Sequence, residues 1–188
     1  MVDYPEDAWI QVYTGGKFHP LAPKVSEVHL VDIAHALAMK CRFSGHTRDF
    51  YSVAQHSVLV AREHQKRYPG YLIGTATALL HDADEAYFPD VASPIKCFLP
   101  EFKKYADPVS NAVMRRFDLL PKKIWQMTWA NIKDIDTSIL FDERKEQLGP
   151  PPGDWGFNAE PLGIEIKPWG WRKAKRKFLE MARVLEIR

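Results

Sequence analysis

The sequence predicts an all-α helical bundle with a small N-terminal β-hairpin. Most of the chain places apolar residues at the three- and four-residue spacing of amphipathic helices, and glycine and proline clusters separate these segments. Loose alternation of β-forming residues around Gly15-Gly16 predicts the hairpin. A length of 188 residues suits one domain. We expect residues 1–188 to form that domain, with a hairpin at 8–20, a helical core at 26–147 and a C-terminal loop and helix at 149–188.

Composition and charge exclude several classes of protein. Apolar residues make up 46% and charged residues 27%, which are ordinary globular proportions. The net charge of +2 is too weak to indicate a nucleic-acid binder. No stretch approaches the roughly 18–20 uncharged apolar residues of a membrane helix, and the acidic start lacks an apolar signal core. We therefore expect a cytoplasmic protein, whose Cys41 and Cys97 are buried thiols.

The N-terminal elements follow from short local signals. Residues 9–20, WIQVYTGGKFHP, predict the hairpin because Gly15-Gly16 lies between β-forming residues. Helical spacing then predicts helices over residues 31–40 and 50–67, with a loop over 42–49 between them. Tyr68-Pro69-Gly70 ends the second helix.

The rest of the sequence predicts longer helices separated by proline-rich loops. The dense apolar run in residues 71–86 predicts the most buried helix. Further helices are expected over residues 101–117 and from Pro121 to about residue 147, since proline suits the first helical position. Residues 149–170 predict a long loop with one strand at Ile164–Ile166, and an amphipathic helix follows over 171–186.

Polar residues among core-type neighbours indicate a candidate metal site. His81-Asp82 closes the apolar run, where an unpaired buried carboxylate costs several kcal/mol unless a cation is present. His56 lies within an apolar helix, and Asp136 lies among isoleucines. Two imidazoles and two carboxylates suit Mn, Fe, Co, Ni or Zn better than Ca or Mg. On a helix, Glu85 would share a face with His81 and Asp82, within reach of a water on the metal.

Each of these residues alone has a plainer explanation. His56 would more often be a core histidine bonded to a backbone carbonyl. Asp136 would more often be a surface residue or a partner of Arg144. Asp134 competes for the same role from a different face of the helix. Spacing alone does not connect His56 to Asp136, although one metal site would explain all of them together.

The order His56, His81-Asp82, Asp136 resembles the metal signature of the HD-domain phosphohydrolases, which is an isolated His, an adjacent His-Asp and a distant Asp. Residues 81–96, HDADEAYFPDVASPIK, resemble the small HD-domain 5′-deoxynucleotidases. Residues 33–57 resemble compact HD proteins that include nucleotide triphosphohydrolases. The resemblance covers roughly the helical core and implies an HD-domain helical bundle.

The resemblance also implies roles for individual residues. The four signature residues would bind a divalent transition metal such as Mn, Co, Fe, Ni or Zn. Glu85 would orient or deprotonate the attacking water. Asp90 would help to hold the substrate or the proton-transfer network.

Substrate contacts are carried over from the same family. Arg42-Phe43 stands near the place of an Arg-Trp pair that contacts the nucleotide in the deoxynucleotidases, and a Phe can stack but cannot donate a hydrogen bond. Lys96 would meet a phosphate, or it would be a surface lysine after a proline turn. His46 and Arg48 would reach a phosphate, or they would only hold the loop in place.

These observations predict a metal-dependent hydrolase of nucleotide phosphate bonds, with 5′-deoxynucleoside monophosphates as the first expected substrates. The alternatives are a (d)NTP triphosphohydrolase that releases nucleoside and tripolyphosphate, and a non-catalytic nucleotide-binding HD domain. An enzyme acting on a signalling nucleotide is a further alternative. Analogy with small family members implies a homodimer. The basic run in residues 171–178 fits a solvated helix face, so neither nucleic acid nor membrane is an expected partner.

Overall fold

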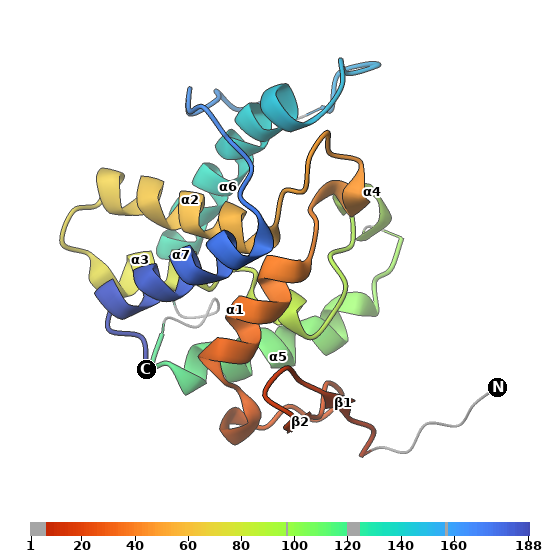
Figure 1. Ribbon diagram of the computed structural model, residues 1–188, viewed down its shortest axis with the longest axis vertical. Helices are drawn as coiled ribbons and strands as arrows, with labels where there is room; N and C mark the ends of the chain where they lie inside the picture. Colours follow the sequence, from red (N-terminus) through yellow and green to blue (C-terminus); the bar gives the residue numbers. More distant parts are fainter. Residues whose placement is uncertain (1–6, 97, 120–124, 157) are drawn as a thin grey trace.

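The computed structural model describes residues 7–96, 98–119, 125–156 and 158–188, and it is mostly helical, as the sequence predicts (Figure 1). Near the N-terminus, strands β1 (Ile10–Gln11) and β2 (Lys17–Phe18) form the predicted antiparallel hairpin. The helices that follow are α1 (Leu30–Met39), α2 (Val53–Arg67), α3 (Leu72–Leu79), α4 (Ser93–Lys96), α5 (Phe102–Arg116), α6 (Gln126–Gln147) and α7 (Trp171–Val184). Short 3-10 turns are η1 (Val25–Glu27), η2 (Phe43–Gly45) and η3 (Ala83–Ala86).

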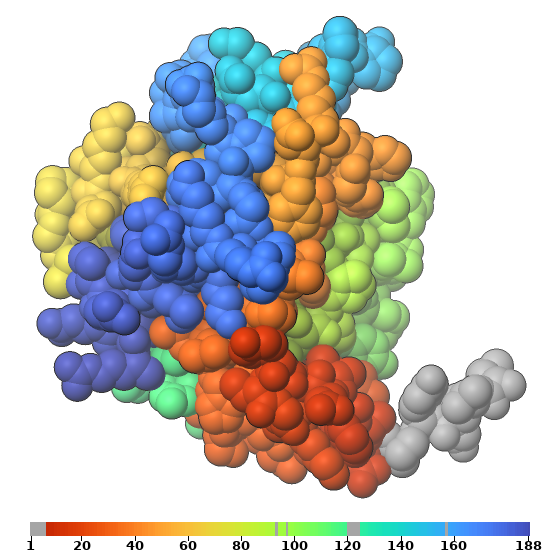
Figure 2. Space-filling view, viewed as in Figure 1, coloured from red at the N-terminus to blue at the C-terminus, as the bar shows by residue number. Residues whose placement is uncertain are grey.

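Helix α2 is the central element of the bundle, because it packs against α1, α3, α6 and α7. The buried apolar residues form one contiguous cluster that extends from Phe18 in the hairpin to Ile187 after α7. Figure 2 shows α7 and the segment before it on the surface of the bundle, between the α2–α3 pair and α1. A side chain on the buried side of α2 is therefore held on several sides.

The start of α2 is fixed by its own cap and by the chain that precedes it. The Ser52 hydroxyl oxygen accepts a hydrogen bond from the backbone N–H of Gln55 at 3.1 Å. The backbones around Lys40–Arg42 and Tyr51–Val53 run antiparallel, with Arg42 N–H donating to the Tyr51 carbonyl at 2.8 Å. The loop between them thus begins and ends beside the first turn of α2.

Helix α3 ends earlier than the single helix expected over residues 71–86. The His81 side chain donates from Nδ1 to the Ala78 carbonyl at 2.8 Å. In a continuing helix that carbonyl would accept from the N–H of Asp82. The imidazole takes its place, α3 stops at Leu79, and the chain turns into η3.

The predicted strand at Ile164–Ile166 is wrong, because the described part of this segment contains no strand. Side chains of α2 and α6 pair its backbone instead. Asp142 accepts from the N–H groups of Leu162 and Gly163 at 2.7 and 3.0 Å. Gln147 donates to the Ile166 carbonyl at 2.8 Å. Side chains of α2 and α6 therefore hold the backbone of this segment in place of a neighbouring strand.

Two expectations fall on residues that the structure does not describe. The proposed start of a helix at Pro121 lies outside the described residues, and α6 begins at Gln126. Cys97 also lies outside them, whereas Cys41 is a half-buried free thiol. No helix within the described ranges has both the length and the apolar character needed to cross a membrane.

Ser52→Ala should destabilise the protein by about 1 kcal/mol, because it removes the side-chain cap of α2. Urea unfolding followed by circular dichroism measures this change. Ser110→Ala is the matched control, since that serine lies within α5 and caps no helix. Equal free energies of unfolding for Ser52→Ala and the wild type would contradict the assigned cap.

Candidate metal centre

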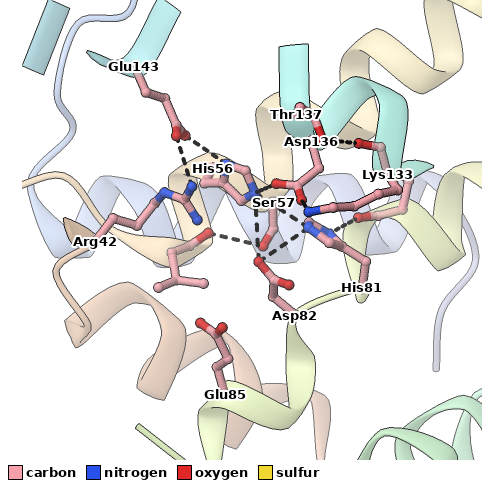
Figure 3. A network of polar contacts seen from close by, with 12 residues as sticks. Arg42, His56, Ser57, His81, Asp82, Glu85, Lys133, Asp136, Thr137 and Glu143 are labelled. Atoms are coloured by element: carbon pink, nitrogen blue, oxygen red, sulfur yellow. Dashed lines mark hydrogen bonds and ion pairs between the residues drawn. The ribbon is translucent and has the colours of Figure 1, made fainter. Parts of the chain in front are cut away.

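The structure brings together the four residues of the predicted metal set from three separate segments (Figure 3). His56 comes from α2, His81 and Asp82 follow the end of α3, and Asp136 comes from α6. The two Nε2 atoms of His56 and His81 lie 3.4 Å apart. Asp82 Oδ2 lies 3.2 Å from His81 Nε2, and Asp136 Oδ1 lies 3.2 Å from His56 Nε2.

The hydrogen bonds of the two histidines assign their tautomers. Ala78 offers a carbonyl oxygen, which can only accept, so Nδ1 of His81 carries the proton. His56 Nδ1 lies 2.7 Å from the carboxylate of Glu143, which also accepts. In the neutral rings, both Nε2 lone pairs are therefore free of protons, and they face each other beside two carboxylates.

This donor set fits a divalent transition metal. Ligand atoms of His56, His81 and Asp82 all lie within 4.8 Å of one another. Two nitrogens that each lie about 2.1 Å from one ion, at a roughly tetrahedral angle, are separated by about 3.4 Å. Facing lone pairs flanked by carboxylates require a cation, which can be a proton or a metal ion. Mixed nitrogen and oxygen ligands favour a transition metal over Ca or Mg.

Asp136, and not Asp134, belongs to this cluster. The Asp136 side chain is 19% exposed and is also paired with Lys133 at 2.6 Å. Asp134 is 63% exposed and pairs with Arg67 at 2.8 Å. The two aspartates lie on different faces of α6, which resolves the competition that the sequence left open.

The charges of the cluster shift one another's proton affinity. Burial alone would lower the pKa of His81, but the Asp82 carboxylate raises that pKa to about 9. Burial alone would raise the pKa of Asp82, yet its pairing with His81 holds that pKa below its ordinary value. The pKa of Asp136 is likewise held well below its ordinary range, against the effect of burial, by its hydrogen bond to His56. The cluster thus keeps two carboxylates ionised in a buried place, as a cation site requires.

Glu85 points toward the cluster from η3 (Figure 3). It is 7% exposed, and its Oε2 atom has no hydrogen-bond partner within the described structure. Burial and the nearby charges of Asp82 and Asp90 raise the pKa of Glu85 to about 9. A carboxyl group with one unpartnered oxygen beside a cation site is suited to hold a water molecule.

The candidate substrate residues differ in how they are placed. Arg42 is 12% exposed and pairs with Glu143 at 2.8 Å, and its guanidinium lies over the Phe43 ring. Lys96 Nζ lies 3.5 Å from Glu85 Oε1, so Lys96 joins the edge of the centre. His46 is exposed. Arg48 lines a separate pocket of about 580 Å³ at the C-terminal end of α6.

Two residues that the sequence interpretation missed support the centre. Glu143 is fully buried and holds His56. It follows Asp136 by seven residues, which is two helical turns, so this spacing could have placed it on the same face of α6. The ammonium group of Lys40, just after α1, donates hydrogen bonds to the carbonyls of Glu85 and Phe88 and so fixes η3 against α1. No local sequence signal indicated that contact.

Two uncharacterized bacterial proteins are similar to this chain. YfdR of Escherichia coli is 30% identical over 139 residues, which span 74% of this chain and 72% of that protein. RCAP_rcc00048 of Rhodobacter capsulatus is 36% identical over 118 residues, which span 60% of this chain and 59% of that protein. No protein-family model matches the sequence.

The wild-type protein should bind Mn²⁺ or Co²⁺ after chelator treatment, and His81→Ala and Asp82→Ala should abolish this binding because each removes a ligand atom. Isothermal titration calorimetry measures the binding, and circular dichroism checks that each variant is folded. His29→Ala removes an exposed histidine and should bind metal as the wild type does. Undiminished binding by folded His81→Ala would rule out the assigned site.

Proposed function

The chain belongs to the family of the Escherichia coli protein YfdR, and we propose that it is a metal-dependent phosphohydrolase that acts on the phosphate bond of 5′-nucleotides. Deoxynucleoside monophosphates are the first proposed substrates. The order His56, His81-Asp82, Asp136 supports this proposal, since it resembles the signature of the HD-domain phosphohydrolases.

The observation that carries the proposal is the convergence of two imidazole Nε2 atoms and two carboxylates beside Glu85, whose buried Oε2 atom has no hydrogen-bond partner within the described residues. A structural ion pair needs no third acidic group with a buried oxygen left without a hydrogen-bond partner, because burying such an oxygen costs free energy. Perturbed carboxyl groups next to a cation site are typical of catalytic centres.

His56, His81, Asp82 and Asp136 would hold the metal. When bound, a divalent metal supplies polarisation of a phosphate oxygen and makes water a stronger nucleophile near neutral pH. The remaining chemistry would belong to the protein. Glu85 would hold the water in line with the phosphorus and, in its ionised form, which the positive charge of Lys96 favours, take its proton as the bond from oxygen to phosphorus forms.

The charged residues at the edge of the centre would bind the phosphate. Arg42 and Lys96 carry the positive charge that offsets the negative charge of the phosphate oxygens. As the ester bond breaks, its electron pair goes to the 5′ oxygen of the sugar, which takes up the proton that Glu85 accepted from the water. The products are a nucleoside and inorganic phosphate.

Product analysis tests the reaction directly. Chelator-treated protein, resupplied with Mn²⁺ or Co²⁺, is offered dNMPs, dNTPs and their ribonucleotide counterparts, and the products are separated by chromatography. Release of nucleoside and inorganic phosphate from dNMPs is the expected result. Tripolyphosphate from dNTPs would instead indicate a triphosphohydrolase. Tight nucleotide binding without turnover would contradict the hydrolase proposal and favour a binding domain.

Glu85→Gln should lower kcat by about 100- to 10,000-fold, because an amide cannot accept the proton of the attacking water. Metal binding should persist, since Glu85 is not in the ligand set. Glu101→Gln, at a glutamate with a 74% exposed side chain, is the matched control and should keep full activity. Steady-state kinetics on the preferred substrate measure both effects, and unchanged kcat in Glu85→Gln would remove this residue from the mechanism.

A further inference from the structure

Glu143 lies at the middle of a buried hydrogen-bond network that extends beyond its contact with His56. Its side chain is fully buried on α6. One carboxylate oxygen accepts from His56 Nδ1 at 2.7 Å and from the Tyr51 hydroxyl at 2.8 Å. The other oxygen accepts from the Arg42 guanidinium at 2.8 Å. Figure 3 shows this carboxylate reaching both His56 and Arg42.

The two charged partners of Glu143 face different parts of the candidate site. His56 presents its opposite nitrogen, Nε2, to His81 and Asp136. Arg42 keeps unused donor capacity, because its buried Nε has no hydrogen-bond partner within the described residues. One carboxylate therefore touches both a candidate metal ligand and Arg42, a cation that the family resemblance assigns to the substrate.

We infer that Glu143 is a positioning residue that links His56 to Arg42, so that metal binding and phosphate binding are coupled through one buried carboxylate. This inference rests on the proposed function. Accepting from Nδ1 keeps the proton on that nitrogen and makes Nε2 a better ligand, as carboxylate partners of metal-binding histidines do. Accepting from Arg42 fixes the plane of the guanidinium before a phosphate arrives.

A purely structural role of Glu143 does not explain all of its contacts. Burying an ion pair adds little stability compared with apolar residues of similar volume, so stability alone gives weak reason for this charge. Glu143 would connect α6 to the loop before α2 even without the bond to His56, since Arg42 and Tyr51 already donate to its carboxylate. The contact with His56 Nδ1 is therefore not needed to connect α6 to this loop.

The first test measures Co²⁺ affinity of the full-length chain by calorimetry for the wild type, Glu143→Gln and Tyr51→Phe. Glu143→Gln should weaken Co²⁺ binding by about 10- to 100-fold. Tyr51→Phe removes a neutral donor from the same carboxylate oxygen and should weaken it far less. Unchanged Co²⁺ affinity in folded Glu143→Gln would overturn the positioning role, whereas a wild type that binds no Co²⁺ would overturn the proposed metal centre itself.

The second test measures the coupling to Arg42. At saturating Zn²⁺, the affinity for inorganic phosphate is compared among the wild type, Arg42→Gln, Glu143→Gln and the double variant. If Glu143 acts through Arg42, the double variant should lose less affinity than the two single losses combined. Strictly additive losses would overturn the coupling.

A measurement on the wild type covers the case in which Glu143→Gln does not fold. Nitrogen-15 NMR of the Zn²⁺-loaded protein reports which ring nitrogen of each histidine carries a proton. The proton of His56 should be found on Nδ1, facing Glu143. A proton on Nε2 of His56 would overturn the inference.

Discussion

The candidate centre depends on one hydrogen bond, from His81 Nδ1 to the Ala78 carbonyl. In a continuing helix the Ala78 carbonyl would accept from the N–H of Asp82, so this bond replaces a helical one just after α3 ends at Leu79, where the chain turns. The same bond fixes the tautomer of His81 and directs Nε2 toward His56. Without it, a continuous helix would carry His81 and Asp82 about 100° apart and would carry the following acidic residues along its own axis.

The centre is then completed by groups that the packing of α2 and α6 supplies. Asp136 and Glu143 lie two turns apart on one face of α6, and His56 on α2 lies between them. One carboxylate meets Nε2 of His56 and the other meets Nδ1, so both sides of the ring are used. The side chains of Glu143 and His56 are fully buried, and uncompensated charges there would be costly. The network therefore favours a single arrangement of ionised carboxylates around a cation.

Much of the fold could be predicted from local signals, because each helix carries its own apolar period. The hairpin around Gly15-Gly16 and helix α5 have close to the predicted bounds. The end of α3 could not be predicted, since it depends on a histidine side chain competing with a backbone donor. The path of residues 162–167 also could not be predicted, because Asp142 and Gln147 on α6 pair its backbone.

The site shows the same division. The pattern of His56, His81-Asp82 and Asp136 was visible in the sequence, and the structure places these residues together. The choice of Asp136 over Asp134 required the face of α6 that packs on α2. Glu143 and Lys40 act through contacts between distant elements, which no spacing rule reports unless the packing is known.

We propose that one divalent transition metal lies between His56, His81, Asp82 and Asp136. Anomalous diffraction from crystals grown with Mn²⁺ or Co²⁺ tests it most directly. We expect a strong anomalous peak within ligand distance of the Nε2 atoms of His56 and His81, with carboxylate oxygens of Asp82 and Asp136 beside it. Well-ordered density for all four side chains with no anomalous peak between them, or a peak at another place, would contradict the proposed metal centre.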